Sequence, residues 1–171
     1  MRHKTQGERA RALLPQEDLD GYALMLLGQR RTLVLTDEKN IVFDAETGCI
    51  YLPRKNTKTR LVQWLKQNAL RILQNVTAQK AREMGVSCKA VKINSARSKW
   101  GCCTYDNEIR YSFRLLYAPK EVIEYVVVHE LSHVRHKNHS QAFWREVQKY
   151  APDYKARRQW LKDNRVLMQI F

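Results

Sequence analysis

The sequence has 171 residues, of which 44% are hydrophobic and 28% charged, as is typical of one globular domain with its own core. It contains no apolar run of the roughly 18 residues that a membrane-spanning helix needs, and the charged N-terminal stretch lacks the apolar segment of a signal peptide. We therefore expect a cytoplasmic protein without membrane contact. The formal net charge of +14 is compatible with a nucleotide or nucleic-acid partner, but no nucleic-acid motif accompanies it, and a solvated basic surface is the simpler interpretation.

The first part of the chain predicts an N-terminal lead followed by a sheet. Residues 1–20 have no clear periodicity and are expected to form a flexible basic lead, with a single domain over residues 21–171. Between residues 22 and 53, short apolar runs alternate with turn-like stretches. This alternation predicts a small antiparallel sheet.

The middle of the chain predicts a long helix and two more strands. Apolar residues recur at helical spacing from about Thr57 to Met84, and Gly85 stands where a C-terminal cap belongs. The stretches CKAVKIN (residues 88–94) and EIRYSF (residues 108–113) alternate as strands do. Together with the first sheet, this succession indicates an α+β fold.

The last part of the chain predicts three helices. Pro119 suits the first turn of a helix whose apolar stripe runs through residues 122–134. A break is expected near Lys137 and Asn138, where Asn tolerates a left-handed turn. A second helix then ends at Pro152, and a third one follows it.

The stretch VVVHELSHVRHKNHSQAFW (residues 126–144) contains four of the five histidines of the chain. His129 and His133 are four residues apart, so on a helix they lie on one face and can share one zinc ion. Glu130 follows His129 and can lean over the open position of the metal. The motif H-E-x-x-H therefore predicts a site in which a zinc-activated water attacks a peptide bond and Glu130 is the general base.

A catalytic zinc ion normally has three protein ligands, so a third one is needed. His136 is too far along a continuous helix from His129, whereas His139 follows the expected turn and is the favoured ligand. Glu146 on the next helix is the alternative. The expected cofactor is one Zn²⁺ per chain, held by His129, His133 and His139.

A structural zinc site is a further possibility, because such sites are usually closed by four protein ligands that include cysteines. Cys102 or Cys103 as a fourth ligand would favour this interpretation. The chain contains no C-x-x-C pair, and reduced, buried cysteines are the simpler expectation.

The histidine motif, together with SKWGCC, YSFRLLYAP and PDYKARRQWL, resembles the YgjP-like metallopeptidase family over nearly the whole chain. The resemblance implies that His129, His133 and His139 hold zinc and that Glu130 is catalytic. It also implies a minimal zincin-like architecture, in which small antiparallel sheets pack against the helix that carries H-E-x-x-H. The chain departs from the usual R-W-G-S-C string of the family, since it has Lys99 and Cys102 at the first and fourth positions.

Substrate contacts are predicted less sharply than the metal site. A strand near residues 99–104 could pair with an extended peptide, and Trp100 is then either a pocket wall or a core residue. Tyr111, Arg110 and Arg114 are the candidates for stabilising the oxyanion. We take Trp100, Tyr111 and Arg114 forward as substrate-binding residues.

Three functions are weighed on this basis. The leading one is a zinc-dependent metallopeptidase that acts on polypeptides. The second is a metal-dependent nucleoside triphosphate pyrophosphatase, which the basic charge suits but which lacks a phosphate-cradling glycine loop. The third is a peptidase module associated with DNA, whose binding should weaken steeply with salt. The sequence contains no signal of oligomeric state.

Overall fold

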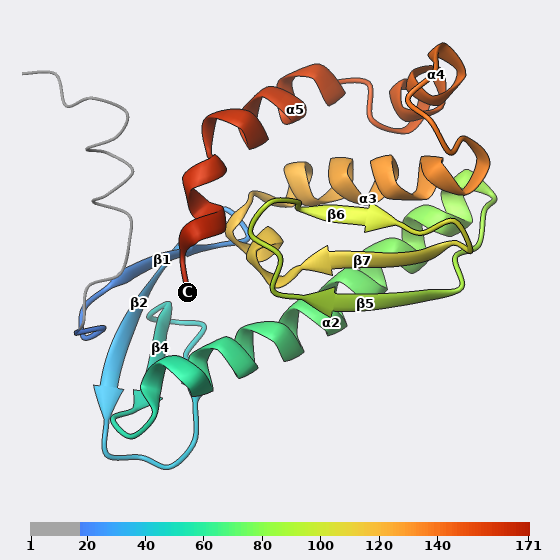
Figure 1. Cartoon of the computed structure of the whole chain (residues 1–171). Coiled ribbons are helices and arrows are strands. Elements are labelled where there is room, and N and C mark those ends of the chain that lie inside the picture. Colours follow the sequence, from blue (N-terminus) through green and yellow to red (C-terminus); the bar gives the residue numbers. More distant parts are fainter. Residues whose placement is uncertain (1–17) are drawn as a thin grey trace, which may run out of the picture.

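The computed structural model describes residues 18–171, and this part of the chain has the predicted α+β fold (Figure 1). The expected lead over residues 1–20 lies mostly outside the described residues. Of its last residues, Leu19 is buried in the core and Asp20 accepts a hydrogen bond from the Leu35 N–H at 2.8 Å. The core therefore begins at least two residues before the predicted boundary at residue 21.

The first sheet has the strand order β1-β2-β4-β3, with β1 (Ala23–Leu26), β2 (Gln29–Thr36), β3 (Val42–Phe43) and β4 (Cys49–Pro53). Leu27 and Gly28, both with positive φ, form the tight turn between β1 and β2. The prediction of a purely antiparallel sheet is wrong, because β2 and β4 pair in parallel. After β2 the chain first forms the edge strand β3. The next strand, β4, then lies between β2 and β3, parallel to β2 and antiparallel to β3.

Helix α2 (Thr57–Met84) has the predicted bounds and the predicted cap. Gly85 adopts φ 63°, and its N–H donates to the carbonyl groups of Ala81 and Arg82. The buried side chains of α2 recur every four residues along one face. These are Leu61, Leu65, Ala69, Leu73 and Thr77, and Met84 is buried at the end of the helix.

The second sheet has the order β5-β7-β6, with β5 (Ala90–Asn94), β6 (Gly101–Cys103) and β7 (Glu108–Ser112). Here too the antiparallel prediction is wrong for one pair, since β5 and β7 are parallel and only β6 and β7 are antiparallel. Strand β6 confirms the strand expected near residues 99–104. It is an edge strand and lies beside α3 (Lys120–Arg135) (Figure 1).

Helices α3, α4 (Gln141–Tyr150) and α5 (Tyr154–Asp163) follow the predicted order, and two short 3₁₀ helices span Phe113–Tyr117 and Arg165–Gln169. Ser140 caps α4 by accepting a hydrogen bond from the Phe143 N–H at 3.3 Å. The turn between α3 and α4 does not use the left-handed Asn138 that the sequence suggested; the chain leaves α3 with His136 in an extended conformation. No helix among residues 18–171 is long and apolar enough to cross a membrane.

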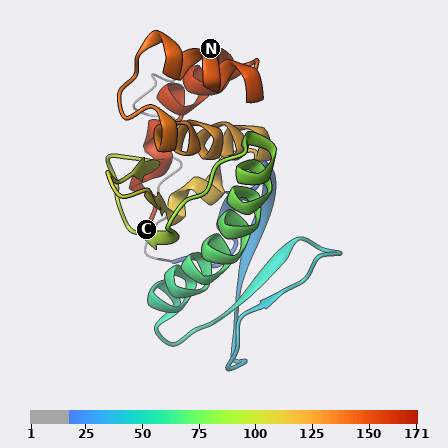
Figure 2. The ribbon, with the colours of Figure 1, turned by 90° about the vertical axis from the view of Figure 1, so that its right-hand side faces the viewer.

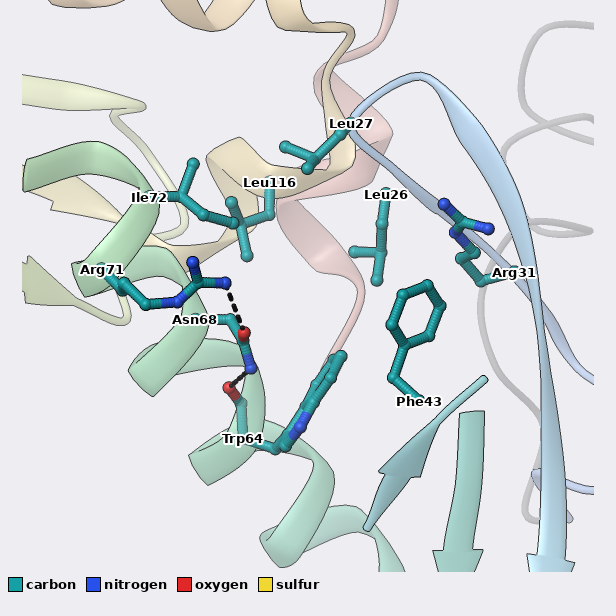
Figure 3. A pocket seen from close by; sticks show the side chains of 9 residues that line it. All are labelled: Leu26, Leu27, Arg31, Phe43, Trp64, Asn68, Arg71, Ile72 and Leu116. Atoms are coloured by element: carbon teal, nitrogen blue, oxygen red, sulfur yellow. Dashed lines mark hydrogen bonds between the residues drawn. The ribbon is translucent and has the colours of Figure 1, made fainter. Parts of the chain in front are cut away.

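The two ends of the molecule differ in what they contain. Both views place β3 and β4 at one end and α4 and α5 at the other (Figures 1 and 2). A cavity of about 150 Å³ lies between the first sheet and α2 (Figure 3). Its walls are mostly apolar, and Arg31 and Arg71 are its charged lining residues.

Candidate metal centre

Three imidazoles converge where α3 ends and α4 approaches. His129 and His133 lie one turn apart on α3 with ring centroids 5.1 Å from each other, and His139 comes from the connection to α4. Their possible ligand nitrogens all lie within 4.8 Å of one another, and the Nε2 atoms of His129 and His139 are 3.2 Å apart. Nitrogens bound at 2.0–2.1 Å to one tetrahedral zinc ion lie about 3.3 Å apart, so this donor set fits such an ion.

The hydrogen bonds of the rings leave Nε2 as the inward-facing atom. His133 donates from Nδ1 to the carbonyl oxygen of His136 at 2.9 Å. The Nδ1 of His129 faces the Tyr125 hydroxyl at 3.5 Å. Burial, reinforced by the neighbouring His133 and His139, lowers the pKa of His129 to about 3. The imidazole is therefore neutral, which is the form that binds a metal.

Two aromatic side chains at the start of α4 hold the rings in place. Phe143 is fully buried, and its ring stacks on that of His133 with 4.5 Å between the ring centroids. It makes edge-to-face contacts with His129 and His139, with centroid distances of 4.9 and 4.8 Å. Trp144 stacks on His139 at 5.8 Å. These contacts restrict the imidazoles to one arrangement, as outer partners do in metal sites.

Glu130 lies beside this cluster and is only 6% exposed. Burial raises the pKa of its carboxyl group to about 8, against the opposing effects of the Cys103 backbone N–H and of Lys99. Because the Cys103 N–H belongs to edge strand β6, the sheet itself orients the carboxylate.

Gly101 is a residue of this site that the sequence did not identify. A Cβ at this position would lie 2.9 Å from Oε1 of Glu130, closer than real Cβ atoms come, and 3.1 Å from Cδ1 of Tyr111, which is tighter than most real contacts. Only glycine lets β6 approach the glutamate this closely. The signal was a glycine inside a short strand, which often marks a close approach.

A cavity of about 230 Å³ opens beside the glutamate and His129. Lys99 and Trp100 line it from the loop before β6, Gly101 lines it from β6 itself, and α3 and α5 supply the other lining residues. Trp100 therefore lies where a substrate contact was predicted.

The other two predicted substrate contacts are in the core. Tyr111 is fully buried and its hydroxyl lies 3.1 Å from that of Thr77 on α2. Arg114 is 2% exposed and donates to the main-chain carbonyl groups of Ser95 and Ile170 at 2.8 and 3.0 Å. Neither residue lines the cavity, so the structure gives no support for their predicted substrate contacts. The prediction rested on their nearness in sequence to α3, which does not show that both side chains point into the core.

The alternative ligands are occupied elsewhere. Glu146 pairs with Arg135 at 2.5 Å, and Arg135 also donates to the Met84 carbonyl. Cys102 and Cys103 are free thiols, and burial raises the pKa of Cys103 to about 11. In residues 18–171 the group of side chains that could share a metal ion consists of the three histidines, without a cysteine.

The model of the YgjP-like metallopeptidase domain matches residues 2–164. The chain belongs to the YgjP-like metallopeptidase family. The resemblance inferred from the sequence is thereby confirmed, and the protein is a metallopeptidase, a hydrolase that depends on a metal ion. The family match starts at residue 2 and so includes most of the segment expected to be a lead.

Two solved structures of metallopeptidase zymogens are similar to parts of the chain. Abylysin of Pyrococcus abyssi has a TM-score of 0.45 at 22% identity, covering 52% of this chain and 92% of that chain. Jannalysin of Methanocaldococcus jannaschii has a TM-score of 0.44 at 14% identity, covering 52% and 94%. No curated protein matches the chain significantly.

Proposed function

We propose that the protein is a zinc-dependent peptidase in which His129, His133 and His139 hold one Zn²⁺ and Glu130 is the general base. The observation that carries the proposal is the convergence of three imidazole nitrogens within 4.8 Å beside a buried carboxylate. Three protein ligands are the number that catalytic zinc sites use, whereas structural sites are closed by four.

The donor set favours zinc among the common divalent ions. Neutral imidazoles suit zinc, while magnesium and calcium require oxygen ligands, and within residues 18–171 Glu130 is the one carboxylate that lines the cavity beside the cluster. When bound, zinc supplies Lewis acidity, which polarises a carbonyl group and lowers the pKa of a water molecule.

Glu130 is placed to move the proton of the reaction. Burial alone raises the pKa of its carboxyl group to about 8, and a bound divalent cation would lower it again and so favour the ionised form. In that form the carboxylate takes a proton from the water that attacks the peptide carbonyl carbon and delivers it to the departing amine nitrogen. The hydrogen bond from the Cys103 N–H and the contact with Gly101 hold the carboxylate in one orientation during both transfers. Its burial excludes water that would compete for the proton.

The outer edge of β6 is the proposed binding site for the main chain of the substrate. The Ser112 N–H donates to the Trp100 carbonyl at 2.9 Å, and the Thr104 N–H donates to the Glu108 carbonyl at 2.8 Å. Since antiparallel strands alternate, the peptide groups of Gly101 point to the opposite, outer edge. An extended polypeptide can add to this edge by main-chain hydrogen bonds and lie across the cavity.

The substitution Glu130→Gln tests the proposal, because glutamine keeps the shape of the side chain but cannot accept the proton. We expect kcat for a mixture of synthetic peptides, followed by mass spectrometry, to fall by about 10²–10⁴-fold. Glu124→Gln is the matched control, since Glu124 lies on the same helix with a side chain 52% exposed.

The same preparations are incubated with nucleoside triphosphates. Unchanged peptide cleavage in Glu130→Gln contradicts the proposed base. Pyrophosphate release that depends on Glu130, in the absence of peptide cleavage, would mean that the site hydrolyses nucleoside triphosphates instead of peptides.

A further inference from the structure

We propose that the cavity beside Glu130 selects substrates with an acidic side chain next to the scissile bond and that Lys99 sets this preference. The inference rests on the proposed peptidase function, since it names the class of polypeptide that the same site accepts.

Lys99 is an exposed cation at this cavity. It lines the cavity together with His129 and Glu130. Among residues 18–171 no carboxylate lies within ion-pair distance of Lys99, although eight ion pairs occur in that range. Its ammonium group is therefore available to an anionic group that enters the cavity.

A second cation lies on the α5 side of the site. The guanidinium group of Arg158 lies 5.1 Å from the ring centroid of Trp144, which stacks on His139. The neighbouring Arg157 pairs with Asp153, whereas no carboxylate in the described part of the chain pairs with Arg158. The contact with Trp144 places Arg158 next to the ring that packs on the histidine cluster.

The charges facing the site are therefore unbalanced. Glu130 is the carboxylate that lines the cavity, and a hydrogen bond from the Cys103 N–H already satisfies part of its accepting capacity. Lys99 lines the same cavity without an ion-pair partner among residues 18–171, and Arg158 lies outside the lining, over the Trp144 ring. The positive charges of Lys99 and Arg158 therefore attract a substrate carboxylate. They repel a substrate lysine or arginine.

The walls of the cavity suit a side chain with an apolar stem. Trp100, Val126 and Leu161 line it, and its volume of about 230 Å³ corresponds to several water molecules at about 30 Å³ each. The methylene groups of a glutamate can pack on these walls while its carboxylate reaches the ammonium group of Lys99. No glycine-rich loop is present that would cradle a phosphate instead.

The test uses pairs of synthetic peptides that differ in a single residue, glutamate or glutamine, at each of the positions around a cleaved bond. With the zinc-loaded protein we expect kcat/KM to be about tenfold higher for glutamate at one position, with the preference weakening as salt is added. Lys99→Glu should reverse the preference, so that lysine at this position is cleaved faster than glutamine. Lys58→Glu, an exposed site in the first turn of α2, makes the same change in net charge and should leave the preference unaltered.

Binding of the same labelled peptides to Glu130→Gln protein, measured by fluorescence anisotropy, separates selection from turnover. Tighter binding of the glutamate peptides that disappears in Glu130→Gln/Lys99→Glu upholds the inference even where no peptide is cleaved and the peptidase function fails. Equal binding and equal cleavage of the two peptides at every position overturn it. A glutamate preference that survives Lys99→Glu unchanged overturns the role of Lys99.

Discussion

Two cavities in the described part of the chain differ in the groups that face them. The cavity of about 230 Å³ beside β6 is lined by a histidine, a buried carboxylate and a lysine, whereas the cavity of about 150 Å³ beside the first sheet has no histidine, carboxylate or cysteine in its lining (Figure 3). Its two arginines, Arg31 and Arg71, cannot act as general bases at neutral pH. A cavity is a candidate active site when possible metal ligands and a group that can carry a proton converge on it, and of these two cavities the first meets this condition.

Among substitutions that test this difference between the cavities, we expect His139→Ala to have the largest effect on zinc content and activity. Loss of the third imidazole leaves two protein ligands, so we expect zinc content after dialysis to fall to a small fraction and kcat/KM to fall by about 10³-fold or more. His136→Ala is the matched control, because His136 contacts the cluster through its carbonyl oxygen, which the substitution retains. Stoichiometric zinc in His139→Ala would contradict the proposed ligand set and reopen the question of Glu146.

A smaller effect is expected where the sheet touches the glutamate. Gly101→Ala would place a methyl group 2.9 Å from Oε1 of Glu130, which must shift the carboxylate or the strand. Since misplacement by about 1 Å can cost roughly 10² in rate, we expect kcat to fall by about that factor while zinc content stays stoichiometric. Native kcat with a native thermal midpoint would mean that the approach of β6 does not position Glu130.

The convergence of the three histidines could be predicted because most of the information for it is local. The spacing of His129 and His133 needs only the helical period, and the apolar pattern of residues 57–84 and the cap at Gly85 are equally local. His139 needed one further assumption, that the chain turns back after α3. It does turn back, although through an extended His136 rather than a left-handed Asn138.

The pairing of the strands and the surroundings of the site depend on contacts between distant segments. Parallel pairing of β2 with β4 and of β5 with β7 follows from where the intervening chain packs, which no local pattern records. The same holds for Tyr111: its alternation identifies a strand but not which face meets α2. The role of Gly101 requires knowing that β6 lies against Glu130.

The second cavity supplies the smallest and most discriminating test, because it separates stability from catalysis. Ile72 lines this cavity from α2, and Ile72→Val removes one methylene-sized group from its wall. We expect the free energy of unfolding to fall by about 1 kcal/mol in urea denaturation, with kcat/KM per folded molecule unchanged. The substitution removes no polar group, and Ile72 lines the cavity beside the first sheet but not the one beside β6, so any loss of activity must be transmitted from one cavity to the other. A tenfold fall in kcat/KM at full folding would therefore show that the two cavities are coupled, and the division of the molecule into a catalytic and a purely structural hollow would be wrong.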